Sequence, residues 1–319
     1  MGFRMHVVDS SFQQLMHIPP AAALWAFEIP GRVFWPYFAG AALLTIGLTI
    51  VIKNEVSQAH GLEKIMLFGR LFYAVPMAVF GAQHFTAGKF IVSIVPSWIP
   101  AHLFWVYLVG IALFASALSI VANRHAPLAA TLLGIMLFLF VLLIHVPNVV
   151  AHPGDRFAWA VALRDIAFSG GAFAFAGAHT KACRPHALPW LVTVGRFFIA
   201  VPTVFFGVEQ FLHPEFVPGI PLNKVTATWV PARLFWAYLA GAILLAAGAS
   251  IMVKKKVRLA ATCLGIMILL LVLFVYLPTL VAHPSDIANE LNFVVDTLAF
   301  SGAALLLADA MPKEDHPQR

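Results

Sequence analysis

Nine apolar stretches, each about 20 residues long, account for most of this 319-residue chain. A helix of about 20 apolar residues is long enough to cross the hydrocarbon core of a bilayer. Only 11% of the residues are charged, whereas soluble domains carry about 25%. We therefore predict an all-α polytopic transmembrane bundle with nine spans, at residues 33–52, 64–85, 102–122, 128–146, 157–178, 190–212, 232–253, 259–277 and 287–308.

One motif occurs three times: a proline, a polar residue two positions later, and then Phe-Trp-x-Tyr-x-x-Gly. The copies begin at Pro30, Pro100 and Pro231. Proline is favoured at the first position of a helix, and Trp and Tyr are enriched where a span meets the lipid headgroups. The motif thus predicts a helix start with interfacial anchors, which in the last two copies are Trp98, Trp105, Tyr107, Trp229, Trp236 and Tyr238.

Further motifs recur between the two halves of the chain. They are Gly69-Arg70 and Gly195-Arg196, Phe80-Gly81 and Phe206-Gly207, Leu128-Ala129-Ala130-Thr131 and Leu259-Ala260-Ala261-Thr262, Ala151-His152-Pro153 and Ala282-His283-Pro284, and Ala167-Phe168-Ser169-Gly170 and Ala299-Phe300-Ser301-Gly302. Spans two to five and six to nine are therefore predicted to be two copies of one four-helix unit. A unit with an even number of spans returns the chain to its starting side, so the copies are parallel repeats rather than inverted ones.

This repeat divides the chain into five segments. We expect an N-terminal segment with the first helix (1–63), unit 1 (64–180), a basic linker (181–190), unit 2 (191–311) and a polar tail (312–319). The first 28 residues contain charges and no long apolar core, which predicts no cleavable signal peptide. Lys and Arg concentrate on the side of the linker, so this side is expected to be cytoplasmic, with the N-terminus outside and the C-terminus inside.

Several of these repeated motifs resemble those of a known family. They are the Gly-Arg start of each unit's first helix, its Phe-Gly end, the Trp-x-Pro and Phe-Trp-x-Tyr motif, the Leu-Ala-Ala-Thr helix and the His-Pro loop. Over residues 64–311 the chain resembles the DoxX-like family of small four-helix membrane proteins, taken as two units. The resemblance implies the inner membrane of a bacterium. Because some members are linked to thiosulfate:quinone oxidation or to membrane redox complexes, it also implies a quinone as ligand and a membrane redox enzyme as partner. It supplies no catalytic residue.

Ionisable residues inside a span are costly and point to function. Here they gather in the half of the spans away from the basic loops. Arg164 and Asp296 are equivalent in the repeat and opposite in charge, so they are expected to pair. The full set of candidates for ligand binding or proton relay is Glu209, Gln210, Gln83, His84, His145, Tyr276, Arg164, Asp165 and Asp296.

Two interpretations of these residues stay open. In the first, Arg164 closes a structural ion pair with Asp296 or Asp165, and the other polar groups cap helix ends among the headgroups. In the second, the same groups line an outward-facing pocket between the two units, which holds a polar head such as a quinone ring or relays protons. Paired buried charges occur in both kinds of site.

Other functions lack a motif. The 13 histidines include no i, i+4 pair and the two cysteines form no CxxC, so no metal or haem site is indicated. There is no Walker motif, dinucleotide loop or nucleophile elbow, and the basic charge lies in short loops, so no nucleic-acid partner is expected. The sequence requires no cofactor and leaves the oligomeric state open. We expect a non-catalytic membrane component that binds a lipophilic molecule or supports a redox complex. A transporter or channel for a small solute is the alternative, and an enzyme acting on quinone, as a quinone-linked oxidoreductase subunit, is the third hypothesis.

Overall fold

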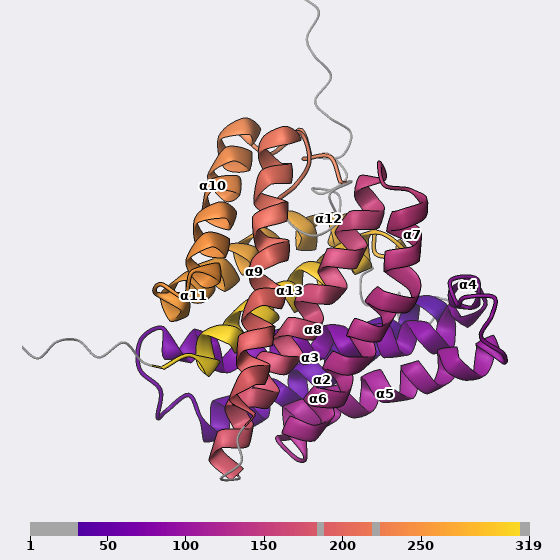
Figure 1. The fold of residues 1–319 in the computed structure, drawn as a ribbon, viewed down its shortest axis with the longest axis horizontal. Helices are drawn as coiled ribbons and strands as arrows, with labels where there is room; N and C mark the ends of the chain where they lie inside the picture. The colour runs from indigo at the N-terminus through magenta and orange to yellow at the C-terminus, as the bar shows by residue number, and fades with distance from the viewer. Residues whose placement is uncertain (1–30, 184–187, 219–223, 313–319) are drawn as a thin grey trace, which may run out of the picture.

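The computed structural model describes residues 31–183, 188–218 and 224–312 (Figure 1). Within these residues nine helical spans are long and apolar enough to cross a membrane. The predicted all-α, nine-span bundle is therefore confirmed, and the chain is an integral membrane protein. The N-terminal segment up to residue 30, residues 184–187 of the predicted linker and residues 313–319 of the predicted tail lie outside the described residues.

Apart from one additional short helix in unit 1, the described residues of the two units form the same elements in the same order. A leading helix, α2 (Gly31–Asn54), precedes both. Unit 1 consists of α3 (Glu63–Thr86), the short α4 (Gly88–Val92), α5 (His102–Ala122), α6 (Ala126–Phe140), the π-helix η3 (Val141–His145), α7 (Val146–Ala151) and α8 (Arg156–Cys183). Unit 2 consists of α9 (Pro189–Leu212), α10 (Arg233–Met252), α11 (Val257–Leu271), the π-helix η4 (Val272–Tyr276), α12 (Leu277–Ala282) and α13 (Glu290–Ala310).

We call the end of the bundle that carries Trp98 and Trp229 the tryptophan end, and the end that carries Arg124 and Lys255 the basic end. A hydrogen bond within unit 1 recurs at the equivalent position of unit 2. The Ser169 hydroxyl donates to the carbonyl of Gly134 at 2.8 Å, and its equivalent in unit 2, Ser301, donates to the carbonyl of Gly265 at 2.7 Å. The two units therefore share local packing as well as helix order.

The units exchange their packing partners. The first helix of unit 1, α3, packs against α13, which is the last helix of unit 2, and α9 packs reciprocally against α8. Glycines permit this contact: a Cβ added to Gly302 would lie 2.4 Å from the backbone nitrogen of Tyr73, and one added to Gly195 would lie 2.5 Å from the carbonyl oxygen of Gly170. Small residues allow such close backbone approach between membrane helices.

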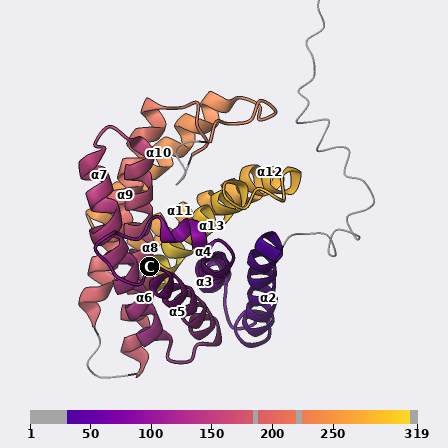
Figure 2. The ribbon, with the colours of Figure 1, turned by 90° about the vertical axis from the view of Figure 1, so that its right-hand side faces the viewer.

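Helices α8 and α13 cross at the centre of the bundle (Figure 1). At the crossing a Cβ on Gly171 would lie 2.6 Å from the Cβ of Ala303, and these two positions are equivalent in the repeat. In the most apolar stretch of each of these helices 83% of the residues are buried, against 28% in α2, which packs at the edge of the bundle on α3 (Figure 2). The two central helices are shielded from lipid and can therefore carry charged residues.

The fourth and eighth spans are longer than predicted. We expected them to end at residues 146 and 277, but each continues through a π-helix and a short α-helix to Ala151 and Ala282. Pro147 and Pro278 explain the π-helices, because a proline cannot donate to the carbonyl four residues earlier and its ring crowds that carbonyl. One wider turn accommodates the proline without ending the helix.

The prediction that the motif prolines begin their helices is wrong, and one predicted span start is shifted. The motif prolines Pro100 and Pro231 do not begin their helices, because α5 starts at His102 and α10 at Arg233. The residue between, Ala101 or Ala232, has a left-handed backbone with φ of 55° or 50°, which turns the chain into the helix. The ninth span begins at Glu290 rather than at residue 287.

Candidate functional site

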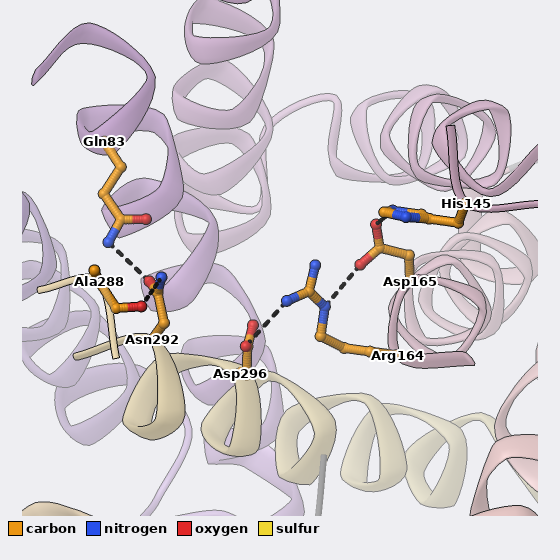
Figure 3. A network of polar contacts seen from close by, with 7 residues as sticks. All are labelled: Gln83, His145, Arg164, Asp165, Ala288, Asn292 and Asp296. Atoms are coloured by element: carbon orange, nitrogen blue, oxygen red, sulfur yellow. Dashed lines mark hydrogen bonds and ion pairs between the residues drawn. The ribbon is translucent and has the colours of Figure 1, made fainter. Parts of the chain in front are cut away.

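A chain of ion pairs crosses the centre of the bundle near the tryptophan end (Figure 3). The guanidinium of Arg164 donates from Nε to Oδ1 of Asp165 at 2.9 Å and from Nη1 to Oδ2 of Asp296 at 3.0 Å. The other oxygen of Asp165 lies 2.9 Å from Nε2 of His145. Four ionisable side chains from α8, α13 and η3 thus form one continuous network, which includes the Arg164–Asp296 pair that the repeat predicted.

The repeat explains why these groups meet. Arg164 precedes Gly171 by about two helical turns, as Asp296 precedes Ala303, so equivalent faces of α8 and α13 meet at both levels. Asp165 is the next residue on α8 and points to the neighbouring helix of its own unit. There the π-helix η3 ends in His145, whose imidazole faces that carboxylate.

The network holds two carboxylates and one guanidinium. Asp165 and Asp296 are both buried, and the Arg164 side chain is only 23% exposed and lies over the ring of Phe168. Isolated charges are costly inside a membrane. With a neutral His145 the network carries one net negative charge, and with a protonated His145 it is neutral. Each carboxylate of the network therefore has Arg164 as its cationic partner.

Two amides and a second histidine lie beside the network. Nε2 of Gln83 donates to Oδ1 of Asn292 at 2.8 Å, and Nδ2 of Asn292 donates to the carbonyl of Ala288 at 3.0 Å (Figure 3). Nδ1 of His84 lies 2.7 Å from the carbonyl of Phe80. Since a carbonyl only accepts hydrogen bonds, this nitrogen carries the proton, and in the neutral imidazole Nε2 of His84 is the acceptor.

These groups form the polar end of a pocket of about 830 Å³ within unit 1. Small-molecule sites have volumes of about 300–1,000 Å³ and combine apolar walls with a few placed polar groups. Its polar lining residues are Gln83, His84, His145, Arg164, Asp165 and Asn292, and most of its remaining wall comes from apolar residues of α3, α5, α6, η3 and the segment 91–100.

Exposed residues of the pocket lining lie on α5 and α6, at the flank of the bundle. Leu108 and Leu139 line the pocket from these two helices, and both are exposed on the lipid-facing surface. Trp98 and Trp105 line it at the tryptophan end and are also exposed. Toward the basic end its wall is made of buried apolar residues such as Leu113. A ligand would therefore enter from the membrane rather than through the bundle.

The same region of unit 2 is filled. Tyr276, the counterpart of His145, is fully buried, and its hydroxyl donates to the carbonyl of Pro218 at 3.3 Å. Gln210, the counterpart of His84, donates to the carbonyl of Phe216 at 3.1 Å. Residues 216–218, which follow α9, thus close over this region, so the two units differ where their helices are alike.

The predicted site residues therefore separate into two groups. The first group lines the pocket and consists of Gln83, His84, His145, Arg164 and Asp165. Asp296 forms an ion pair with Arg164. Glu209 pairs instead with Arg156 at 2.7 Å, while Gln210 and Tyr276 bind the loop of unit 2. The expected pocket between the units is thus a pocket inside unit 1, to which unit 2 contributes Asn292.

Sequence reasoning missed three partners. Asn292 lies one turn before Asp296 on the same helix face, a spacing that marks it as a neighbour. Arg156 pairs with Glu209 across units, and Lys224 forms an ion pair with Glu290. These last two pairs join segments that are far apart in the sequence, and neither partner shows a local signal of the contact.

The predicted anchors also differ in role. Trp98 and Trp105 line the pocket, and Nε1 of Trp105 donates to the carbonyl of Pro100 at 3.1 Å. The remaining anchors lie away from the pocket lining: Tyr107 stacks on Phe85, Tyr238 stacks on Phe211, and Trp229 and Trp236 belong to unit 2. Among the described residues, no group of three or more His, Cys, Asp or Glu side chains is placed to hold a metal ion.

No model of a known protein family matches the chain. No curated protein and no solved structure matches it either. The site is therefore interpreted from its own geometry.

Proposed function

We propose that this integral membrane protein binds a lipophilic small molecule in the pocket of unit 1. The observation that carries the proposal is the combination of a membrane-facing apolar cavity of about 830 Å³ with the Arg164–Asp165–His145 network at one end. The apolar part of the ligand would lie between α5 and α6, and its polar head would face the network.

The pattern of polar groups supports a binding role over transport. A solute path needs polar groups through both halves of the membrane, whereas the described polar lining of this pocket lies at the tryptophan end only. Toward the basic end, buried Leu113 and Leu137 belong to the continuous apolar core. Transport of a small solute is therefore the second choice.

A quinone-like ligand fits this arrangement, because a ring with an apolar tail has the same division between a polar head and an apolar body. The resemblance to DoxX-like proteins adds the proposal that the chain supports a membrane redox complex at the bacterial inner membrane. Non-catalytic binding is favoured, since the described residues near the network include no nucleophile paired with a base.

The test uses the full chain purified in membrane nanodiscs, with bound small molecules extracted and identified by mass spectrometry. Ala112 lines the pocket, whereas its neighbour Ile111 is exposed to lipid. Ala112→Phe fills the pocket, and Ile111→Phe adds a ring at the surface as the matched control. We expect a molecule that co-purifies with the wild type and with Ile111→Phe to be lost from Ala112→Phe. Equal retention by all three would show that the pocket is not the binding site.

A further inference from the structure

The pocket presents more than one hydrogen-bonding group with no protein partner to occupy it. Nε and Nη1 of Arg164 make the two ion pairs, and no dashed line reaches the third nitrogen, Nη2, in Figure 3. The N–H bonds of Nη2 therefore remain as donors. His84 lines the pocket with its Nδ1 held by the carbonyl of Phe80, which leaves Nε2 as an acceptor.

The amide of Gln83 adds a second acceptor. Its nitrogen donates to Asn292, so its oxygen is the group left to face the pocket. The polar end thus combines one donor group, Nη2 of Arg164, with two acceptors, on His84 and Gln83. A head that only accepts hydrogen bonds would leave both acceptors without partners, and buried polar groups without partners are unfavourable.

The charge of the network argues against an anionic head. Arg164 is already balanced by Asp165 and Asp296, so the site carries one negative charge when His145 is neutral and none when it is protonated. An anion would therefore approach a group of charges that is negative or neutral in total. Sites for carboxylates and phosphates instead present an excess of positive charge.

We propose that the head of the ligand is uncharged and carries a hydroxyl, which donates to Nε2 of His84 while an oxygen of the head accepts from Nη2 of Arg164. This inference rests on the proposed function and narrows its quinone-like ligand to the hydroxylated form, a hydroquinone, within one ligand class: hydroxylated amphiphiles such as alkylphenols, hydroquinones or sterols. Fatty acids and acidic lipids are excluded from the polar end by charge.

Three probes with the same tail and ring test this inference: para-nonylphenol, its methyl ether para-nonylanisole, and para-nonylbenzoate. Binding of each radiolabelled probe would be measured on the full chain in nanodiscs of phosphatidylcholine. We expect the phenol to bind about tenfold more tightly than the ether, because the ether lacks the donor for one hydrogen bond. The benzoate should bind most weakly.

A pair of histidine variants tests whether His84 accepts the hydrogen bond from the hydroxyl of the phenol. His84→Phe keeps a ring of similar size and removes the acceptor, so the phenol and the ether should bind it equally. His125 lies in an exposed turn at the basic end with φ of 52°, and His125→Asn retains a residue that tolerates this backbone. This control should keep the preference for the phenol, and thermal unfolding would establish that both variants are folded.

The outcomes separate this inference from the proposed function. Equal binding of the phenol and the ether, or tightest binding of the benzoate, would overturn the hydroxyl assignment; if Ala112→Phe then abolished that binding, the pocket would remain the ligand site. A preference for the phenol that persists in His84→Phe would also overturn the assignment to His84. Failure of all three probes to bind any form of the protein would count against the proposed function and this inference together.

Discussion

Arg164 and Asp296 occupy equivalent positions of the two four-helix units, and Nη1 of one donates to Oδ2 of the other at 3.0 Å. Because α8 and α13 meet with equivalent faces, identical units would bring two like charges together at this point. Like charges in an apolar interior repel strongly. The difference between the two copies thus allows an ionised pair at the centre of a bundle whose halves are otherwise alike.

The charge balance predicts unequal effects of removing the two partners. Arg164→Met leaves Asp165 and Asp296 buried without their cation, and we expect a loss of about 3–5 kcal/mol in the free energy of unfolding. Asp296→Leu leaves Arg164 paired with Asp165, so its cost should be clearly smaller. SDS titration of the purified protein in mixed micelles would measure both.

The double variant Arg164→Met and Asp296→Leu sharpens this test. It retains Asp165, whose Oδ2 lies 2.9 Å from Nε2 of His145. We expect the double variant to be more stable than Arg164→Met alone, since the second change removes an unpaired carboxylate. Additive losses of stability would instead show that the network is not governed by charge balance.

Much of this architecture could be predicted from the sequence, because membrane spans depend on local apolar length and the repeat shows which positions are equivalent. The alignment of the two repeats alone predicted that Arg164 and Asp296 pair. The exchange of α3 and α9 between units has no local signal, since glycine motifs indicate a close contact without naming the partner. The closure of unit 2 depends on the path of residues 216–218, which apolar periodicity does not describe. For that reason Glu209 and Tyr276 were expected in a pocket that they do not line.

The exchanged helix contacts predict which glycines are essential. A Cβ on Gly302 would lie 2.4 Å from the backbone nitrogen of Tyr73, and neighbouring backbone cannot move as a flexible side chain can. Gly302→Ala should therefore cost about 1–3 kcal/mol through overpacking. Gly154→Ala is the control, because no heavy atom lies within 4 Å of its added Cβ. Thermal unfolding in one detergent would compare them, and equal melting temperatures would argue against the close contact of α3 and α13.

The difference between the units predicts unequal losses of stability at one equivalent pair of positions. Tyr276 is fully buried, so Tyr276→Ala should leave a cavity and cost about 3–5 kcal/mol, as large aromatic truncations do. His145 borders an existing pocket, and His145→Ala leaves Asp165 paired with Arg164. We expect this change to cost about 1.5–3 kcal/mol, the loss of one hydrogen bond to a charged group.

We expect the amount of co-purifying ligand to depend on position 145 of unit 1 rather than on position 276 of unit 2. His145→Ala alters the polar end of the pocket and should reduce the amount of co-purifying molecule. Tyr276→Phe removes only the hydroxyl that binds Pro218 in the other unit, and it should retain the molecule at the wild-type level. Loss of the molecule from Tyr276→Phe with retention by His145→Ala would place the binding site in unit 2.

The distribution of Lys and Arg predicts which end of the bundle faces the cytoplasm. Basic residues are enriched in cytoplasmic loops, and the turns at the basic end contain Arg124 and Lys255. Single cysteines would be introduced into a variant that lacks both native cysteines, at Arg124 or Lys255 on one side and at Gly154 or Ser285 on the other; all four positions are exposed. A maleimide that cannot cross membranes should label positions 154 and 285 in intact cells, and positions 124 and 255 only after the membrane is opened. The opposite labelling pattern would place the Trp98 loop and the pocket in the cytoplasmic half of the membrane.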